Sequence, residues 1–525
     1  MKHLTTIFKI FSEKRTNCVL LILYLSFISI CQIIASSRFR GYYLLFGSCL
    51  WLAISFFITP IIINFFSNLE IKEELLDIKA SCWKSSLIFG GISFFVLFIY
   101  YAAYFPGAFP TDSIAQYQQV ITGKYSDWHP VLHTLFSFWL PLKITGGWIG
   151  SIALFQILLF SLTLSYCFQT IYKYAGKKYV AGSMIYVLCN PLIRIAVIPW
   201  KDVSFAIGAL LLVVFSVEII MTKGKWFNSS KHIYVFIIVF VFTTIFRHNA
   251  VLFTAPLLFA ILFQITRKKF LIVFFSIIAL YAVIKGPLYS ALQVEKPGYR
   301  QVETLGLPMT VIGAVVTYDT DALDDDILEF AYKIAPKNIW ENHYTLGDYN
   351  NFKWQKESNE DVIEEYGAKK ILEMMLRCLK SSPAISLSSL VKLTESVYTV
   401  TDNHPVSIVP YIDANDYGIE NSSINSILTR IGYGLGYSIQ SFVEDFCPRV
   451  FLFYGVADLL VIISVLSKCN RSNWRTALFA VPLLTYNFGT ALLLTGSSDG
   501  PRFFYFTVLI LPTLLVIFYR KFDHS

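Results

Sequence analysis

The sequence has few charged residues for its length. Asp, Glu, Lys and Arg make up 15% of the 525 residues, whereas hydrophobic residues make up 55% and aromatic residues 17%. An ordinary soluble domain contains about 25% charged residues. The deficit excludes a soluble globular protein. The net charge of +8 is therefore interpreted from its distribution between loops, and no nucleic-acid partner is predicted.

Short motifs of several enzyme and metal-binding classes are also missing. No CxxC or zinc-finger spacing occurs, and most of the nine cysteines lie in apolar runs, so neither a zinc site nor a disulfide framework is predicted. The sequence has no GxSxG, HExxH, Walker or dinucleotide-binding glycine pattern. Serine hydrolase, zinc protease and ATP-driven pump therefore have no local support.

Long apolar runs predict an all-α polytopic membrane protein with about 12 transmembrane helices, because about 20 apolar residues cross the hydrocarbon core of a lipid bilayer. Basic residues precede the first run, but no convincing cleavage site follows it, so we expect a retained first helix. The predicted spans are residues 18–35, 42–66, 86–105, 148–171, 179–198, 203–221, 232–246, 250–266, 270–291, 450–467, 475–495 and 503–520.

The charges of the loops orient these predicted helices. Lys and Arg gather in every second loop, as in the triplet Lys173, Lys177 and Lys178, and the positive-inside rule puts these loops and both termini in the cytoplasm. The stretch 131–145 is short for a bilayer at about 1.5 Å per residue, and a span there would turn the basic loops outward. We expect it to lie along the surface or to re-enter the membrane.

Three regions follow from this topology. Residues 1–292 contain nine spans and the first large outer loop (106–147), residues 293–446 form an outer domain, and residues 447–525 contain three spans. The outer domain has about 12 Lys and Arg against about 23 Asp and Glu, so the excess of positive charge lies in the rest of the chain. That distribution agrees with an outer location.

The outer domain is predicted to be mostly helical. Helical patterns run through residues 322–335, 361–379 and 385–400. The acidic run 324–326 opens the first of these helices, where carboxylates favour the helix N-terminus. We interpret it as a first turn and not as a metal site.

The first outer loop is where apolar sequence gives way to grouped polar side chains, in the stretch FPGAFPTDSIAQYQQVITGKYSDWHPVLH (105–133). Ser113 and Gln116 have the spacing of a capping box, which predicts a short helix over 114–122. Its apolar side chains share one face, as in a helix that lies along a membrane surface, and Gly123 ends it.

Three ionisable residues of this loop are candidates for catalysis. Asp112 is expected just ahead of the first short helix, as an exposed carboxylate. His129 precedes Pro130 at the entry to a second short helix, over 131–140, and His133 lies one turn inside it.

Other polar residues near the ends of the predicted spans fall on the same outer side. Each alone is more often an interfacial cap or anchor than a functional group. Together with the loop residues, they suit a site that deprotonates an acceptor and binds a phosphate leaving group, and Lys285 is expected nearby. The candidates for phosphate or substrate binding are Lys201, Asp202, Arg247, His248 and Arg502.

The sequences PGAFPTDSIAQ and DWHPVLH resemble the first large outer loop of the GT-C fold of integral-membrane glycosyltransferases, which use polyprenyl-phosphate sugars. The resemblance covers this loop and the general layout of the spans. It implies that Asp112 is the catalytic carboxylate and, by position, that Lys201, Arg247 and Arg502 bind the lipid phosphate. Asp112 has no acidic neighbour where the family often has a pair, so no divalent metal is part of the prediction.

The function predicted from these features is transfer of a sugar from a polyprenyl-phosphate carrier to a glycan, glycolipid or protein of the cell envelope, at the outer face of the cell membrane. Asp112 would act as general base, and His129 or His133 would orient the acceptor or the phosphate. Two alternatives stay open: a multi-spanning transporter or flippase of an envelope precursor, and a non-catalytic envelope assembly factor. Carriers usually place coupling carboxylates at mid-membrane, whereas the span interiors here look nearly free of charge.

Overall fold

The computed structural model describes residues 9–35, 41–71, 82–296, 301–400, 410–420, 453–470 and 473–520. These parts are helical, and their only β-structure is isolated bridges. Seven helical stretches in them are long and apolar enough to cross a membrane, as an α-helical polytopic membrane protein requires. They lie in α2 (Arg15–Ala35), α3 (Gly41–Asn68), α4 (Cys82–Ala103), α8 (Gly150–Leu188), α9 (Lys201–Met221), α12 (Arg267–Val283) extended through α13 (Tyr289–Ala291), and α23 (Gly500–Tyr519).

The remaining predicted spans correspond to shorter helices. The stretch labelled α8 consists of two helices that meet in a kink at Gly176 (φ 79°), which lies within the break predicted between residues 171 and 179. The second helix stops at Leu188 because Pro191 follows and starts a 3₁₀-helix. Helices of 11–16 residues replace four other spans, and 16 residues rise only about 24 Å. They are α10 (Ser230–Ile245), α11 (Val251–Leu262), α20 (Tyr454–Lys468) and α22 (Val481–Ala491). The count of 12 spans therefore stays a prediction.

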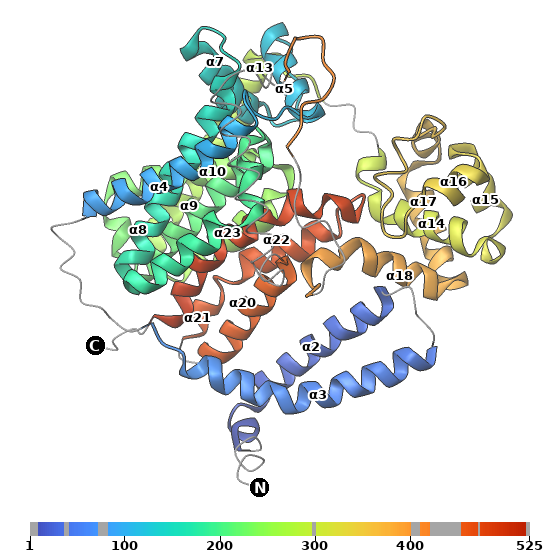
Figure 1. Ribbon diagram of the computed structural model, residues 1–525, viewed down its shortest axis with the longest axis horizontal. Coiled ribbons are helices and arrows are strands. Elements are labelled where there is room, and N and C mark those ends of the chain that lie inside the picture. The colour runs from blue at the N-terminus through green and yellow to red at the C-terminus, as the bar shows by residue number, and fades with distance from the viewer. Residues whose placement is uncertain are drawn as a thin grey trace.

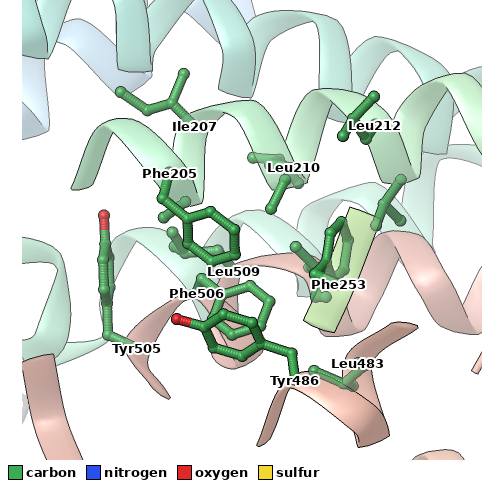
Figure 2. Close-up of a cluster of buried hydrophobic side chains, with 14 of the residues drawn as sticks. Phe205, Ile207, Leu210, Leu212, Phe253, Leu483, Tyr486, Tyr505, Phe506 and Leu509 are labelled. Carbon is green, nitrogen blue, oxygen red and sulfur yellow. The ribbon is translucent and has the colours of Figure 1, made fainter. Parts of the chain in front are cut away.

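Helix α9 lies in the centre of the bundle. It is apolar on all sides and packs against α8, α10 and α23, which is how a helix without a polar face is stabilised. Figure 2 shows Phe205 of α9 beside the rings of Phe253, Tyr486 and Phe506, each of which it contacts. The Phe205 and Tyr486 rings stack with centroids 4.9 Å apart. This packing fixes the start of α9, where two of the candidate site residues lie.

The first helix of the outer loop is α5 (Thr111–Thr122), and it begins earlier than the sequence predicts. The capping box is wrong: Pro110 is the N-cap residue, and the Ser113 side chain is buried and donates a hydrogen bond to the Pro199 carbonyl at 3.4 Å. Asp112 therefore lies in the first helical turn and not ahead of it. Gly123 ends the helix with φ 67°, as predicted.

The second helix of the loop is continuous over residues 131–145 and so is longer than predicted. It consists of α6 (Val131–His133), a π-helical turn η1 (Thr134–Trp139) and α7 (Leu140–Thr145), and it ends at Gly146 with φ 68°. Phe138 and Leu142 pack against the residues that precede α5 and α8. Both short helices are thereby fixed against the end of the bundle.

The described part of the predicted outer domain is helical, as expected, and has a hydrophobic core of its own. The Trp340 ring stacks on Phe352 with centroids 3.9 Å apart in the centre of this core. Figure 1 shows its helices grouped to one side of the bundle. They are α14 (Gly306–Tyr318), α15 (Asp325–Ile334), α16 (Lys337–His343), α17 (Asp361–Ser381) and α18 (Pro383–Thr394). Residues 401–409 and 421–446 of the predicted domain lie outside the described residues, so its boundaries stay a prediction.

The predicted topology has a direct test in two exposed positions. Glu357→Cys, in the inserted region, is expected to react with a membrane-impermeant maleimide in intact cells. Lys268→Cys, in a predicted cytoplasmic loop, is expected to react only after permeabilisation, because the reagent cannot cross the bilayer. Both changes are made in a variant whose nine native cysteines are serine. Labelling of position 268 in intact cells contradicts the orientation.

Candidate functional site

Six of the ionisable residues that the sequence predicts at the outer face lie in one cluster. They come from α5, from the loop that follows it, from the start of α9, from the turn after α10 and from the start of α23. Charge interactions or hydrogen bonds connect each of them to another member. The cluster consists of Asp112, His129, Lys201, Asp202, Arg247 and Arg502.

The chain places these residues at helix ends. Lys201 and Asp202 open α9 directly after Pro199, and Asp202 is favourable there because a carboxylate in the first turn complements the helix dipole. Arg502 follows Pro501 in the first turn of α23. Arg247 has an extended backbone between α10 and the short turn that begins α11. Because α9, α10 and α23 pack together, their ends bring the three cations together.

Carboxylates and guanidinium groups alternate through the cluster. The guanidinium group of Arg502 donates through Nη2 to Oδ2 of Asp112, and through Nε to Oδ2 of Asp202 at 2.8 Å. The other oxygen of Asp202 accepts from Nη1 of Arg247. The exposed fraction of the side chain is 28% for Asp112 and 18% for Arg502, but only 1% for Asp202 and 5% for Arg247. The Asp202–Arg247 pair is thus enclosed, whereas the Asp112–Arg502 pair is partly exposed, so Asp112 is less exposed than the sequence predicted.

Aromatic rings enclose both guanidinium groups. The Arg247 guanidinium carbon lies 4.1 Å from the centroid of the Phe503 ring, and that of Arg502 lies 4.7 Å from the centroid of Trp200. Such contacts are attractive when the cation is partly desolvated. Both guanidinium groups therefore have an aromatic ring beside them as well as their carboxylate partners.

Lys201 is partly exposed and has a different kind of partner. Its Nζ lies 3.3 Å from Nδ1 of His129. A protonated lysine only donates, so Nδ1 accepts and the proton of the neutral imidazole is on Nε2. Within the described ranges Lys201 forms no ion pair with a carboxylate, which leaves its charge available to an anion.

Electrostatics keep Asp112 ionised and His129 neutral. Burial opposes ionisation of Asp112, but the charges of Arg502 and Lys201 and the hydrogen bond from Arg502 hold its pKa well below the usual range. Burial and then the charge of Lys201 lower the pKa of His129 to about 3. At neutral pH the site therefore has an anionic Asp112, a neutral His129 and an excess of cations.

His133 lies beneath the cluster and not in it. It is fully buried, its Nδ1 is 2.6 Å from Oε1 of Gln116, and its Nε2 is 3.1 Å from Oγ of Ser204. Burial and the charges of Lys201 and His129 lower its pKa to about 3. The neutral ring joins α5, α6 and α9, so the structure gives His133 contacts suited to holding these helices together.

Two other predicted residues lie outside the cluster. His248 is exposed and hydrogen-bonds to the backbone of Trp128. Lys285 donates to Oδ2 of Asp127 at 2.8 Å, and the Tyr289 hydroxyl donates to Oδ1 of the same carboxylate at 2.9 Å. Lys285 is therefore neutralised by Asp127 and does not join the six clustered residues.

The sequence analysis missed a buried carboxyl group within a predicted span. Asp458 lies in α20, within a predicted span, and its side chain is fully buried. Nδ2 of Asn487 donates to both of its oxygens, at 2.9 and 3.0 Å, and Oγ1 of Thr507 hydrogen-bonds to the same amide. This residue lies in the interior of a predicted span and was not among the polar residues considered from the sequence. A single Asp within an apolar run was the available signal.

No group of three or more His, Cys, Asp and Glu side chains that could hold a metal ion occurs in the part of the chain that the structure describes. Comparison of the chain with protein-family models, with curated proteins and with solved structures found no match. The chemistry of the cluster is therefore inferred from its geometry.

Proposed function

We propose that this chain is a glycosyltransferase of GT-C type, which moves a sugar from a polyprenyl-phosphate carrier to an acceptor of the cell envelope. The observation that carries the proposal is the partly exposed Asp112–Arg502 pair beside Lys201, at the end of an apolar helix bundle. A partly exposed carboxylate next to cations suits a reaction in which a hydroxyl loses a proton while a phosphate leaves.

In the proposed reaction the acceptor oxygen attacks the anomeric carbon of the donor sugar. The bond from that carbon to the phosphate oxygen breaks, and the hydroxyl proton moves to a carboxylate oxygen of Asp112. Polyprenyl phosphate leaves with the bonding electrons, and its negative charge is stabilised by Lys201 and the outer face of Arg502. Arg247 supports them indirectly, because it shares Asp202 with Arg502.

The low pKa of Asp112 makes it a weak base, so binding of the leaving phosphate supplies much of the rate enhancement. The isoprenoid tail would lie in the bilayer between spans, and the sugar would face outward. The proposal includes 12 spans, cytoplasmic termini and a location in the cell membrane. It uses cationic side chains and no divalent metal.

Surface glycans provide the cellular test. Cells that lack the protein are expected to lose one sugar or branch from an envelope glycan, glycolipid or glycoprotein, and expression of the unsubstituted protein is expected to restore it. The measurement is the monosaccharide and linkage composition of the purified envelope by mass spectrometry. An unchanged composition contradicts the proposal.

The expected pH dependence of transfer follows from the lowered pKa values of Asp112 and His129. His129 stays neutral above about pH 4 because its pKa is about 3, and Asp112 stays ionised because its pKa is lowered. We expect kcat/KM to lack the fall near pH 6.5 that protonation of an ordinary histidine base produces. Since unfolded His129 gains a proton below about pH 6.5 and folded His129 does not, stability is expected to fall as pH falls through that value.

The second candidate is a carrier, which Asp458 favours because a carboxyl buried among membrane helices is typical of coupled transport. Asp458→Asn distinguishes the two. It preserves the size of the side chain, so a transferase is expected to keep most of its transfer rate, whereas a carrier coupled through Asp458 is expected to lose uptake. Transfer and uptake are measured on the same reconstituted preparation.

A further inference from the structure

Residues 410–420 belong to the inserted region in sequence but lie against the first outer loop. Figure 1 shows this segment, in orange, beside α5 and away from α14–α17. The Asp413 carboxylate accepts a hydrogen bond from the Thr111 backbone N–H at 2.6 Å and another from the Thr111 hydroxyl. The Asp413 N–H donates to the Phe109 carbonyl at 3.0 Å. Asp413 thus accepts a hydrogen bond from the backbone at the start of α5, the role that the sequence analysis assigned to Ser113.

Apolar contacts add to these hydrogen bonds. The rings of Tyr117 and Tyr417 meet edge to face with centroids 5.5 Å apart, and Ile419 packs with Phe109 in a small core. The segment also has internal order: Oδ1 of Asn415 accepts from the N–H groups of Tyr417 and Ile419 at 3.1 and 3.0 Å. It is therefore a folded turn fixed on α5.

Tyr411 is an exposed aromatic residue of the segment that Asp413 fixes against Thr111, the residue before Asp112. Its side chain is 48% exposed, and it lies two residues before Asp413. Burial and the charges of Asp413 and Asp112 raise the pKa of its hydroxyl, whereas the charge of Arg502 lowers it.

The inserted region also contacts the turn that precedes Arg502, the other member of the ion pair with Asp112. The N–H of Ser498 donates to Oδ2 of Asp348 at 3.1 Å, and the N–H of Tyr349 donates to the Thr495 carbonyl at 3.0 Å. These bonds fix the turn that leads into Arg502. Asp112 and Arg502 are therefore both adjacent to backbone held by the inserted region.

We propose that residues 410–420 form the acceptor side of the site, with Asp413 as the positioning residue for Asp112 and the Tyr411 ring as a contact for the acceptor. This inference rests on the proposed transferase function. The donor would enter from the bilayer by its isoprenoid tail, whereas this segment lies beside α5, at the end of the helix bundle, from where a polar acceptor would approach. An exposed tyrosine suits a sugar, because its ring covers an apolar face and its hydroxyl hydrogen-bonds.

Amide hydrogen exchange of the protein without substrate tests whether Asp413 fixes the start of α5. Asp413→Ala is expected to speed exchange of the Thr111 amide about tenfold, as loss of one hydrogen bond implies. Asp413→Asn retains an accepting oxygen and is expected to protect that amide. Asp416→Ala is the matched control, because Asp416 is exposed in the same turn. Equal exchange in all three variants overturns the positioning role.

Kinetics test the acceptor role. Tyr411→Ala is expected to raise the KM for the acceptor about tenfold with kcat and the donor KM unchanged, and Tyr411→Phe is expected to retain most of the acceptor affinity. Asp413→Ala is expected to lower kcat about tenfold, and Asp413→Asn is expected to restore it. An unsubstituted protein without transfer activity overturns the proposed function as well. An active protein whose acceptor KM does not respond to Tyr411→Ala overturns this inference alone.

Discussion

The Asp112→Asn variant is expected to transfer sugar at least about a hundredfold more slowly than the unsubstituted protein, with normal insertion and accumulation. Asn has the size of Asp, and its amide oxygen still accepts a hydrogen bond from Arg502, so the fold of α5 is retained. The variant loses the charge that takes the acceptor proton. The measurement is the initial rate of transfer in reconstituted vesicles, normalised to the amount of inserted protein.

Asp321→Asn is the control for this variant, because it removes an exposed carboxylate of the inserted region that belongs neither to the cluster nor to residues 410–420. Its rate is expected to match that of the unsubstituted protein. Near-normal transfer by well-inserted Asp112→Asn would exclude Asp112 as the base. Asp127, which lies in the same loop but is paired with Lys285, would then be the next residue to test.

Asp202→Ala is expected to destabilise the folded protein by about 3–5 kcal/mol, the cost of leaving buried charge without its partner. The side chain is 1% exposed, and its two oxygens neutralise Arg247 and Arg502. Without it, two guanidinium groups repel each other beneath the site. We expect a lower midpoint of thermal unfolding in detergent and reduced accumulation in membranes.

Asp321→Ala serves as the comparison, because Asp321 is an exposed carboxylate of the inserted region. Its midpoint is expected to be unchanged. An Asp202→Ala variant that unfolds at the same temperature as this control would show that the enclosed ion pairs contribute little to stability. Asp202 would then not be required to hold Arg502 in place beside Asp112.

The composition and the distribution of Lys and Arg were sufficient to predict an all-helical membrane protein. They also predicted that Lys201, Arg247 and Arg502 lie on the same side of the membrane, and in the structure all three belong to one cluster. Pairing was not predictable from sequence: nothing in the linear order indicates that Asp202 neutralises two arginines, or that Lys285 is occupied by Asp127. Such partners depend on how the helices pack.

The start of α5 shows how a local pattern fails. Ser113 and Gln116 match a capping box, yet both side chains point into the structure, where Gln116 contacts His133. The helix start is satisfied by Asp413, about 300 residues later in the chain. A long-range hydrogen bond of this kind leaves no signal in the local sequence.

Release of polyprenyl phosphate by the purified protein is the most direct test of the central claim. The protein is reconstituted with lipids extracted from cells that lack it, which retain the donor, and with envelope material from the same cells as acceptor. Mass spectrometry is then used to follow the donor and its products. The account predicts time-dependent release of polyprenyl phosphate, with an equal gain of sugar on the acceptor, and loss of both with Asp112→Asn. An intact donor after prolonged incubation with folded protein would contradict it.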